Sequence, residues 1–237
     1  MNKSIALKEY KCQDLLTLRE TVTTKDFFNK YPEDSAVAIY SRIRSLIKKG
    51  IIHRIGRGKY AIGASKEFLP TIDNKETQLY FQIKEEFPYS SLAIWNLSTL
   101  NSLLQHLVNI NIAIIDIDRE SVESLYWYLK GKGYNVVTRK RMFDGISEYN
   151  GYIFVRPIIT SSPLCKNGTV VTASLEKILV DLACDKEFEP FQGSELYHIF
   201  ENAYNEFTIN SDRLLHYAGR KEKREYVNKI LKHMNRQ

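Results

Sequence analysis

Two aspartates, Asp116 and Asp118, come closest to a catalytic pattern in this sequence. They belong to the segment IIDID, residues 114–118. Alternate residues of a strand share one face, so the two carboxylates would stand side by side, as metal-dependent phosphoryl-transfer enzymes require. The pattern predicts, as one alternative, a nuclease or a nucleotidyltransferase that uses these two residues.

The surrounding sequence favours a protein without catalytic activity. No Gly-Ser element precedes the two aspartates, and no third carboxylate follows at a recognisable spacing. Asp118 also precedes an expected helix over residues 119–130, which it can cap. Residues 161–162 and 165–166 offer serine and cysteine nucleophiles in an expected loop, but no paired histidine supports nucleophilic catalysis. We therefore expect no enzyme activity.

Cysteine and histidine do not indicate a metal site. Cys12, Cys165 and Cys184 are far apart and form no CxxC pair, and the five histidines are scattered. A zinc finger needs four such ligands at short, regular spacings, and a disulfide framework needs an even number of cysteines. We expect reduced cysteines, no metal and no cofactor.

A basic segment, residues 35–62, points instead to nucleic-acid binding. Ser35 can cap a helix that ends at Lys49-Gly50, because glycine readily adopts the left-handed conformation of a helix C-terminus. The turn Gly56-Arg57-Gly58 then connects two short apolar strands into a hairpin. The apolar stripe expected on the helix comprises Ile39, Ile43, Leu46 and Ile47.

The remaining surface of this helix and hairpin is polar and basic. Such a helix suits a DNA groove, and a cationic hairpin beside it is the winged-helix arrangement. The candidate DNA-binding residues are Ser35, Tyr40, Ser41, Arg42, Arg44, Lys48, Arg54, Arg57 and Lys59.

The residues upstream supply the other parts expected of a winged helix. Residues 4–19 are expected to form a first helix. Thr23 or Thr24 can cap a short second helix over residues 25–31, and Pro32 ends it. The order is then helix, short helix, turn, recognition helix and wing.

Charge is divided unevenly along the chain. Residues 1–66 contain 14 Lys and Arg against 6 Asp and Glu, a net charge of +8, although the whole chain is only +6. Residues 67–218 are acidic, and residues 219–237 are basic again. Since neutralisation of phosphates dominates nucleic-acid affinity, DNA is expected at one end of the protein.

The length and hydrophobicity of the chain allow two domains. At 237 residues with 43% hydrophobic residues, it can bury two cores. A boundary near residues 64–74 gives a winged-helix domain over residues 1–66 and a second domain over residues 67–237. No apolar run reaches the length of a membrane span, and residues 1–11 do not form a secretory signal, so we expect a cytoplasmic protein.

The second domain is expected to be a mixed sheet with a helical C-terminal half, which makes the fold class α+β. Its strand and helix patterns alternate before residue 174, and everything after Ser174 is expected to be helical. The expected helices cover residues 78–87, a segment carrying Leu100 to Leu107, and residues 119–130; the expected strands include residues 111–117, 134–138, 152–159 and 170–171.

The segment TASLEKILVDLACD, residues 172–185, opens the helical half. Thr172 or Ser174 can cap a helix, and Glu176 can hydrogen-bond back to the cap. Lys177 and Asp181 are four residues apart and are expected to form an ion pair on a solvated face. We expect this segment to be core architecture without catalytic residues.

Together, the segments resemble the AbiEi family of antitoxins, from AbiE-type (type IV) toxin-antitoxin systems of bacteria. The most similar parts are SRIRSLIKKGIIHRIGRGKYAI, residues 41–62, and the stretch at residues 172–185. The resemblance implies a winged helix that represses its own promoter and a C-terminal domain that neutralises a cognate nucleotidyltransferase toxin. The basic residues near the C terminus of that family correspond to Arg220, Lys221, Lys223 and Arg224, which we expect in the last helix.

The expected function is thus that of an antitoxin and transcriptional autorepressor. Its partners would be double-stranded DNA, bound at inverted repeats in its own promoter, and the toxin, neutralised directly or indirectly. Two alternatives remain: the metal-dependent enzyme with Asp116 and Asp118, and a winged-helix repressor whose second domain senses a small ligand in a closed pocket.

Overall fold

The computed structural model describes residues 21–63, 65–104, 110–139 and 151–234. The helix expected over residues 4–19 lies outside them, as does Leu107. The chain forms two compact units: unit 1 comprises residues 1–67 and 207–213, and unit 2 comprises residues 68–206 and 214–237. Residues 207–213, which the sequence placed in the second domain, join unit 1 through paired hydrogen bonds between Lys66 and Thr208. The architecture is mixed α/β with three small sheets.

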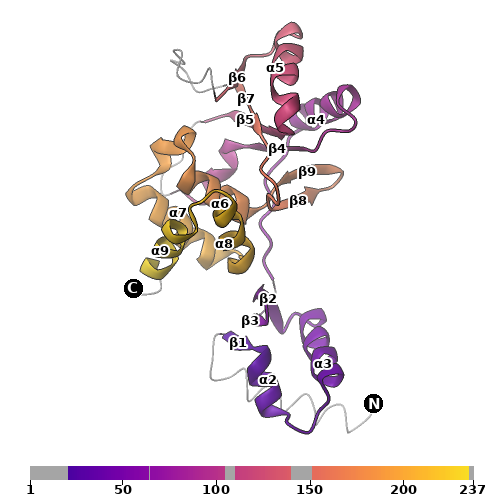
Figure 1. Ribbon diagram of the computed structural model, residues 1–237, viewed down its shortest axis with the longest axis vertical. Helices are drawn as coiled ribbons and strands as arrows, with labels where there is room; N and C mark the ends of the chain where they lie inside the picture. Colours follow the sequence, from indigo (N-terminus) through magenta and orange to yellow (C-terminus); the bar gives the residue numbers. More distant parts are fainter. Residues whose placement is uncertain (1–20, 64, 105–109, 140–150, 235–237) are drawn as a thin grey trace. The chain divides into compact units, whose positions relative to one another are not determined.

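In the described residues of unit 1, helices α2 and α3 and a three-stranded antiparallel sheet surround one core (Figure 1). Its core side chains are Val22, Phe27, Ile39, Ile43, Leu46, Ile52 and Tyr60. The elements are β1 (Thr21–Thr23), α2 (Thr24–Lys30), α3 (Ala36–Lys48), β2 (Ile52–Gly56) and β3 (Lys59–Ile62). Strand β3 is central in the order β1-β3-β2, and β1 was not predicted from the sequence.

The helix ends of unit 1 confirm the predicted signals. Thr23 caps α2 in a reciprocal box, where its backbone N–H donates to the Asp26 carboxylate at 2.7 Å. The Ser35 hydroxyl accepts the Ala38 N–H at 3.2 Å and caps α3. Gly50 follows with a φ of +67°, a backbone conformation that L side chains disfavour.

The apolar stripe of α3 is narrower than predicted. Ile39, Ile43 and Leu46 are buried, but Ile47 is 39% exposed. A helix turns by about 100° per residue, so Ile47 lies at the flank of the stripe. The predicted hairpin is present, with its turn at Arg57-Gly58.

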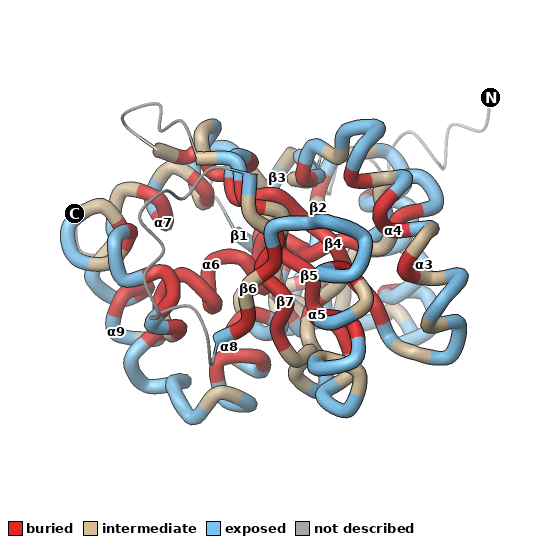
Figure 2. Tube along the Cα trace, turned by 90° about the horizontal axis from the view of Figure 1, so that it is seen from above, coloured by how far each residue is buried: buried red, intermediate tan, exposed pale blue. Residues whose placement is uncertain are grey.

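The central sheet of unit 2 has four strands. It contains β4 (Leu92–Asn96), β5 (Ile112–Ile117), β6 (Val136–Thr138) and β7 (Tyr152–Pro157), in the order β4-β5-β7-β6. Only β4 is antiparallel to its neighbour. Most residues of β4, β5 and β7 are buried (Figure 2), which explains their nearly continuous apolar sequences.

Helices cover both faces of this sheet (Figure 1). Helices α4 (Asn74–Glu86) and α5 (Val122–Gly131) pack on the face that carries Ile115, Ile117 and Val155. Because side chains alternate along a strand, Asp116 and Arg156 project to the opposite face, which faces the C-terminal helices. That alternation positions the charged residues described below.

The C-terminal part of the chain confirms the prediction of helices after Ser174. The helices of this part are α6 (Leu175–Cys184), the 3-10 segment η3 (Lys186–Phe191), α7 (Ser194–Glu206), α8 (Ser211–Arg220) and α9 (Arg224–Met234). None of the helices in the described residues is long and apolar enough to cross a membrane.

Several local predictions for unit 2 were wrong. Helix α4 begins at Asn74, four residues before the predicted start, because Asp73 caps it in a box with Glu76. Residues 97–102 form a 3-10 helix, η1 (Leu97–Ser102), and the helix predicted from residue 119 opens with the 3-10 turn η2 (Arg119–Ser121). Residues 165–166 are not in a loop but in strand β8 (Leu164–Asn167), which pairs with β9 (Val170–Ala173).

Candidate nucleic-acid interface and buried charge cluster

The outer face of α3 is polar, basic and open. Ile39, Ile43 and Leu46 point into the core, and residues on the opposite side of the helix are exposed. That outer face carries Val37, Tyr40, Ser41, Arg44 and Lys48. Within the described residues, neither Arg44 nor Lys48 makes an ion pair, so both charges are available to phosphates.

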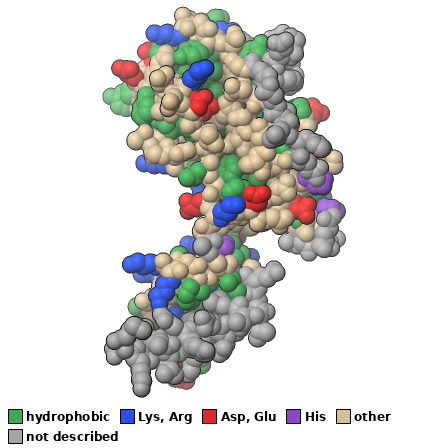
Figure 3. Space-filling model, turned by 180° about the vertical axis from the view of Figure 1, so that it is seen from behind, with side chains coloured by type: hydrophobic (Ala, Val, Ile, Leu, Met, Phe, Trp, Pro, Cys, Tyr) green, Lys and Arg blue, Asp and Glu red, His purple; other side chains and the backbone are tan. Residues whose placement is uncertain are grey.

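The hairpin adds three exposed basic residues, Arg54, Arg57 and Lys59. The Arg54 guanidinium donates to the carbonyl of Gly56 at 3.0 Å. The Arg57 amide N–H donates to the carboxylate of Asp212, a residue of unit 1. Lys and Arg side chains lie at the surface of unit 1 on the face drawn in Figure 3. Ser35 is also exposed, but its hydroxyl serves as the cap of α3.

Arg42 differs from the other candidate DNA-binding residues. The sequence placed it on the open basic surface, whereas its side chain is only 16% exposed. Its guanidinium forms an ion pair with Asp34 and lies 4.0 Å from the centre of the Tyr31 ring. Arg42 lies beside the buried stripe of α3, and its contacts with Asp34 and Tyr31 stabilise the turn between α2 and α3.

The two aspartates of the IIDID segment contact different partners. Asp116 is buried; it accepts from Arg156 Nε at 2.7 Å and lies 2.9 Å from Lys177 Nζ. Asp118 accepts the Ser91 N–H at 2.8 Å and makes no side-chain cap, so the predicted capping role was wrong. In the part of the chain that the structure describes, no group of three or more His, Cys, Asp or Glu could hold a metal ion.

Arg156 is the centre of a buried charge cluster in unit 2. Its Nη2 lies 2.5 Å from Asp181 Oδ2 and its Nη1 lies 3.1 Å from Asp185 Oδ2. Sequence reasoning missed Arg156, although an arginine inside the apolar strand YIFVRP was a usable signal, since arginine is seldom buried without partners. We call the following residues the charge cluster: Asp116, Arg156, Lys177, Asp181, Asp185, Glu187 and Lys221.

The carboxylate of Asp181 collects three further donors. Lys177 Nζ lies 2.6 Å from Oδ2, while Lys221 Nζ at 2.5 Å and the Tyr217 hydroxyl at 2.9 Å reach Oδ1. The sequence predicted the Lys177 and Asp181 pair correctly but placed it on a solvated face, which was wrong. Both side chains are 1% exposed, because α6 is enclosed on all sides.

Glu176, beside this pair, confirms part of the predicted cap. The Ser174 hydroxyl donates to its carboxylate at 2.6 Å, but Ser174 makes no side-chain bond to the helix backbone. The interaction therefore links the two side chains at the start of α6.

Burial and charge shift the pKa values in the cluster. Burial alone would raise the pKa of Asp181, but Arg156, Lys177 and Lys221 outweigh it and hold the pKa well below its ordinary value. Burial and the nearby Asp181 charge raise the pKa of Asp185. The pKa of Lys221 is raised despite burial, because Asp181 and Asp185 stabilise its charge. Burial also raises the pKa of the Cys184 thiol to about 12.

The four basic residues near the C terminus are not equivalent. Arg220 is exposed at the end of α8, Lys223 is exposed in the following turn and Arg224 begins α9, so the prediction of a single last helix was wrong. Lys221 is only 6% exposed and belongs to the charge cluster. Only three of the four are therefore open to a partner.

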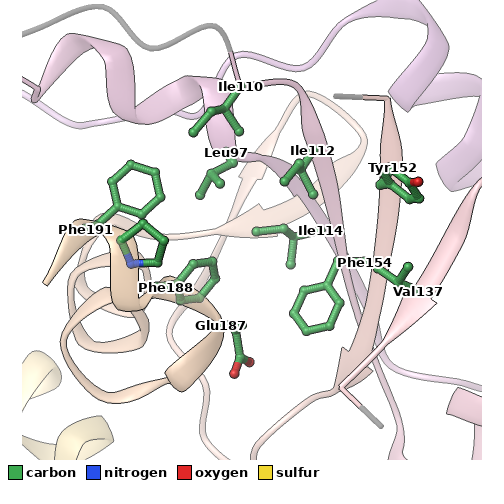
Figure 4. Close-up of a pocket in the computed structure, with 11 residues that line it drawn as sticks. Leu97, Ile110, Ile112, Ile114, Val137, Tyr152, Phe154, Glu187, Phe188 and Phe191 are labelled. Atoms are coloured by element: carbon green, nitrogen blue, oxygen red, sulfur yellow. The ribbon is translucent and has the colours of Figure 1, made fainter. Parts of the chain in front are cut away.

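Unit 2 also contains a small apolar cavity of about 90 Å³ (Figure 4). Its one charged lining residue, Glu187, is bonded to Arg139 at 2.5 Å. The cavity can therefore hold a small neutral, apolar group. The lining residues include Leu97, Ile112, Ile114, Phe154, Phe188 and Phe191.

Comparison with known proteins gives a family but no function. The model of a family described as a family of unknown function (DUF6577) matches residues 38–237. No curated protein matches the chain.

Replacing Lys221 should destabilise unit 2, whereas replacing Arg220 should not. The change Lys221→Met leaves Asp181 and Asp185 without one of their buried cations, which typically costs about 3 kcal/mol or more. We expect the melting temperature to fall by roughly 6–12 °C. The exposed Arg220→Met is the matched control, and equal melting temperatures for the two variants would contradict the buried role of Lys221.

The low pKa of Asp181 predicts a loss of stability in acid. A lowered pKa in the folded state stabilises the fold above the unfolded pKa of about 3.9, and this is lost as pH falls through the folded value. In urea titrations, Asp181→Asn should be less stable than the unmodified protein at neutral pH, and should lose less stability on acidification. The exposed Glu189→Gln should follow the unmodified protein; a parallel acid loss for Asp181→Asn would refute the assignment.

Proposed function

We propose that this chain, which belongs to the DUF6577 family, is a DNA-binding transcriptional regulator whose unit 1 is a winged helix. The observation that carries the proposal is the exposed basic face of α3, opposite its core stripe and followed directly by a hairpin tipped by Arg57. In winged-helix and helix-turn-helix proteins, the second helix of the motif enters the major groove. Here α2 is the first helix and α3 the second.

Double-stranded DNA is the proposed ligand of unit 1. Arg44 and Lys48 lie on the face of α3 that would enter the major groove, while Arg57 and Lys59 would reach the backbone or the adjacent minor groove. One such module reads a short site, so two copies on inverted repeats of its own promoter would raise affinity through effective concentration. In this proposal Arg42 contributes by holding the turn before α3.

We further propose that the protein is an antitoxin, as its resemblance to the AbiEi family implies. Three exposed basic residues at the junction of α8 and α9, Arg220, Lys223 and Arg224, support this part of the proposal. They could compete with a nucleotidyltransferase toxin for its RNA, or bind an acidic surface of the toxin. Lys221 is left out of this surface because Asp181 and Asp185 occupy its ammonium group.

A ligand-sensing repressor is the second candidate, favoured by the apolar cavity of unit 2. Its volume and its apolar lining suit a small neutral compound. The metal-dependent enzyme has less support, because Arg156 and Lys177 occupy the Asp116 carboxylate that would have to bind the cation.

Removing charge from the proposed DNA face should weaken binding to duplex DNA from the chain's own promoter. The triple change Arg44→Ala, Lys48→Ala, Arg57→Ala removes exposed cations without a core contact. If each contacts one phosphate, the slope of log K against log salt should become about 3 smaller in magnitude. Fluorescence anisotropy over a salt series measures it.

A matched control separates this effect from net charge. The triple change Lys75→Ala, Lys130→Ala, Lys186→Ala removes the same charge from exposed positions of unit 2 and should leave the salt slope unchanged. An unaltered slope for the unit 1 triple, or an equal loss for both triples, would refute the proposed interface. Arg42→Ala should lower the melting temperature of unit 1, because it breaks the contacts to Asp34 and Tyr31.

The antitoxin proposal predicts a nucleotidyltransferase gene beside this one, and co-expression with the enzyme that it encodes tests the proposal. The change Arg220→Ser, Lys223→Gln, Arg224→Ser keeps Lys221 and should abolish rescue of growth while promoter binding is retained. The Lys75, Lys130 and Lys186 triple is the control with equal charge loss and should still rescue. Full rescue by the first variant would show that these three residues form an ordinary solvated surface.

A further inference from the structure

We infer that Val37 reads a thymine in duplex DNA by contact with its C5 methyl group. The inference rests on the proposed function of unit 1. Val37 is 80% exposed, more than any other large apolar residue among the described residues of unit 1. It is the second residue of α3, and the first turn of a recognition helix is the part that meets base edges.

The position of Val37 on α3 aligns it with the basic residues. Residues 37, 40, 41 and 44 are spaced at helical intervals and form one stripe, opposite the buried Ile39, Ile43 and Leu46. A helix that sets Arg44 and Ser41 into the groove therefore sets Val37 into it as well. Val37 is not part of the core formed by the described residues of unit 1.

The neighbouring residues leave Val37 protruding. Ala36 and Ala38 flank it with single methyl groups and are themselves exposed. One turn further along, Tyr40 packs edge-on against Phe28 of α2, with ring centres 6.2 Å apart, which holds its ring beside the stripe. The valine side chain thus stands as an apolar knob on an otherwise polar face.

The chemistry of the major groove selects the base. Valine has no hydrogen-bonding group, and among the four bases only thymine presents an apolar group, its C5 methyl, at the floor of that groove. A β-branched side chain on a helix is nearly fixed in one rotamer, so little entropy is lost when it contacts the base. Cytosine, adenine and guanine would instead have a polar edge covered by the valine.

Helix geometry also gives the spacing of the contact. Val37 and Arg44 are seven positions apart, which is about 10 Å along the helix axis. In a helix that lies in the major groove, positions about three residues apart contact successive bases, so the thymine should lie about two base pairs from the position that Arg44 contacts. An arginine at that position most often recognises guanine.

The test removes the methyl group from either side of the contact. Full-length protein selects its sites from a random duplex library, and each thymine of the selected duplex is then replaced singly by deoxyuridine. The unmodified protein should bind about three- to fivefold more weakly at one such position, the effect of one buried methyl group. Val37→Ala should show that loss with the thymine duplex and no further loss with deoxyuridine.

Ile47→Ala is the matched control, since Ile47 is an exposed apolar residue of α3 outside the stripe. It should keep the sensitivity to deoxyuridine. If Val37→Ala remains sensitive to deoxyuridine, the assignment of Val37 is overturned. The proposed function would still stand in that case, provided that the protein selects a duplex from the library and binds it in a salt-dependent way. If the library yields no bound duplex at all, both the proposed function and the role of Val37 fail. Because Val37 lies outside the core, its variant should fold normally.

Discussion

The buried guanidinium of Arg156 is the interaction on which unit 2 depends. It projects from β7 and joins β5 through Asp116 to helix α6 through Asp181, in a region where water is excluded. An unpaired charge there would be costly, and so each ion is surrounded by partners of opposite sign. The cluster thus specifies how the C-terminal helices pack on the sheet, since a shift of α6 would separate several ion pairs together.

The two units use the same residue types in opposite ways. In unit 2, Arg156, Lys177 and Lys221 form buried ion pairs with carboxylates. In unit 1, Arg44 and Lys48 lie on an open helix face, whereas Arg42 of the same helix is paired with Asp34. Position relative to the core, and not residue type, therefore separates cations that hold the fold from cations able to meet a polyanion.

Sequence alone predicted what local physics decides. The caps at Thr23 and Ser35, the stop at Gly50 and the hairpin depend on neighbours within a few residues. The buried position of Arg156 had a signal in the apolar strand around it, but its partners could not be predicted, because Asp116, Arg156 and Lys221 meet only after the sheet and helices have packed. Among the ion pairs of the cluster, only Lys177 and Asp181 have a recognisable sequence spacing, and an i,i+4 pair has the same spacing on a buried helix as on a solvated one. The exposure of Val37 could be recognised only after the buried face of α3 was known.

The packing of the C-terminal helices has a consequence for the chemistry of the Cys184 thiol. Burial raises the pKa of this thiol to about 12, so little of it is thiolate at neutral pH, and the thiolate is the form that alkylating agents and peroxides attack. The cysteine at the end of α6 should therefore be inert while the helix stays packed. The rate at which Cys184 is alkylated would then report how often the C-terminal helices open transiently, without an introduced probe.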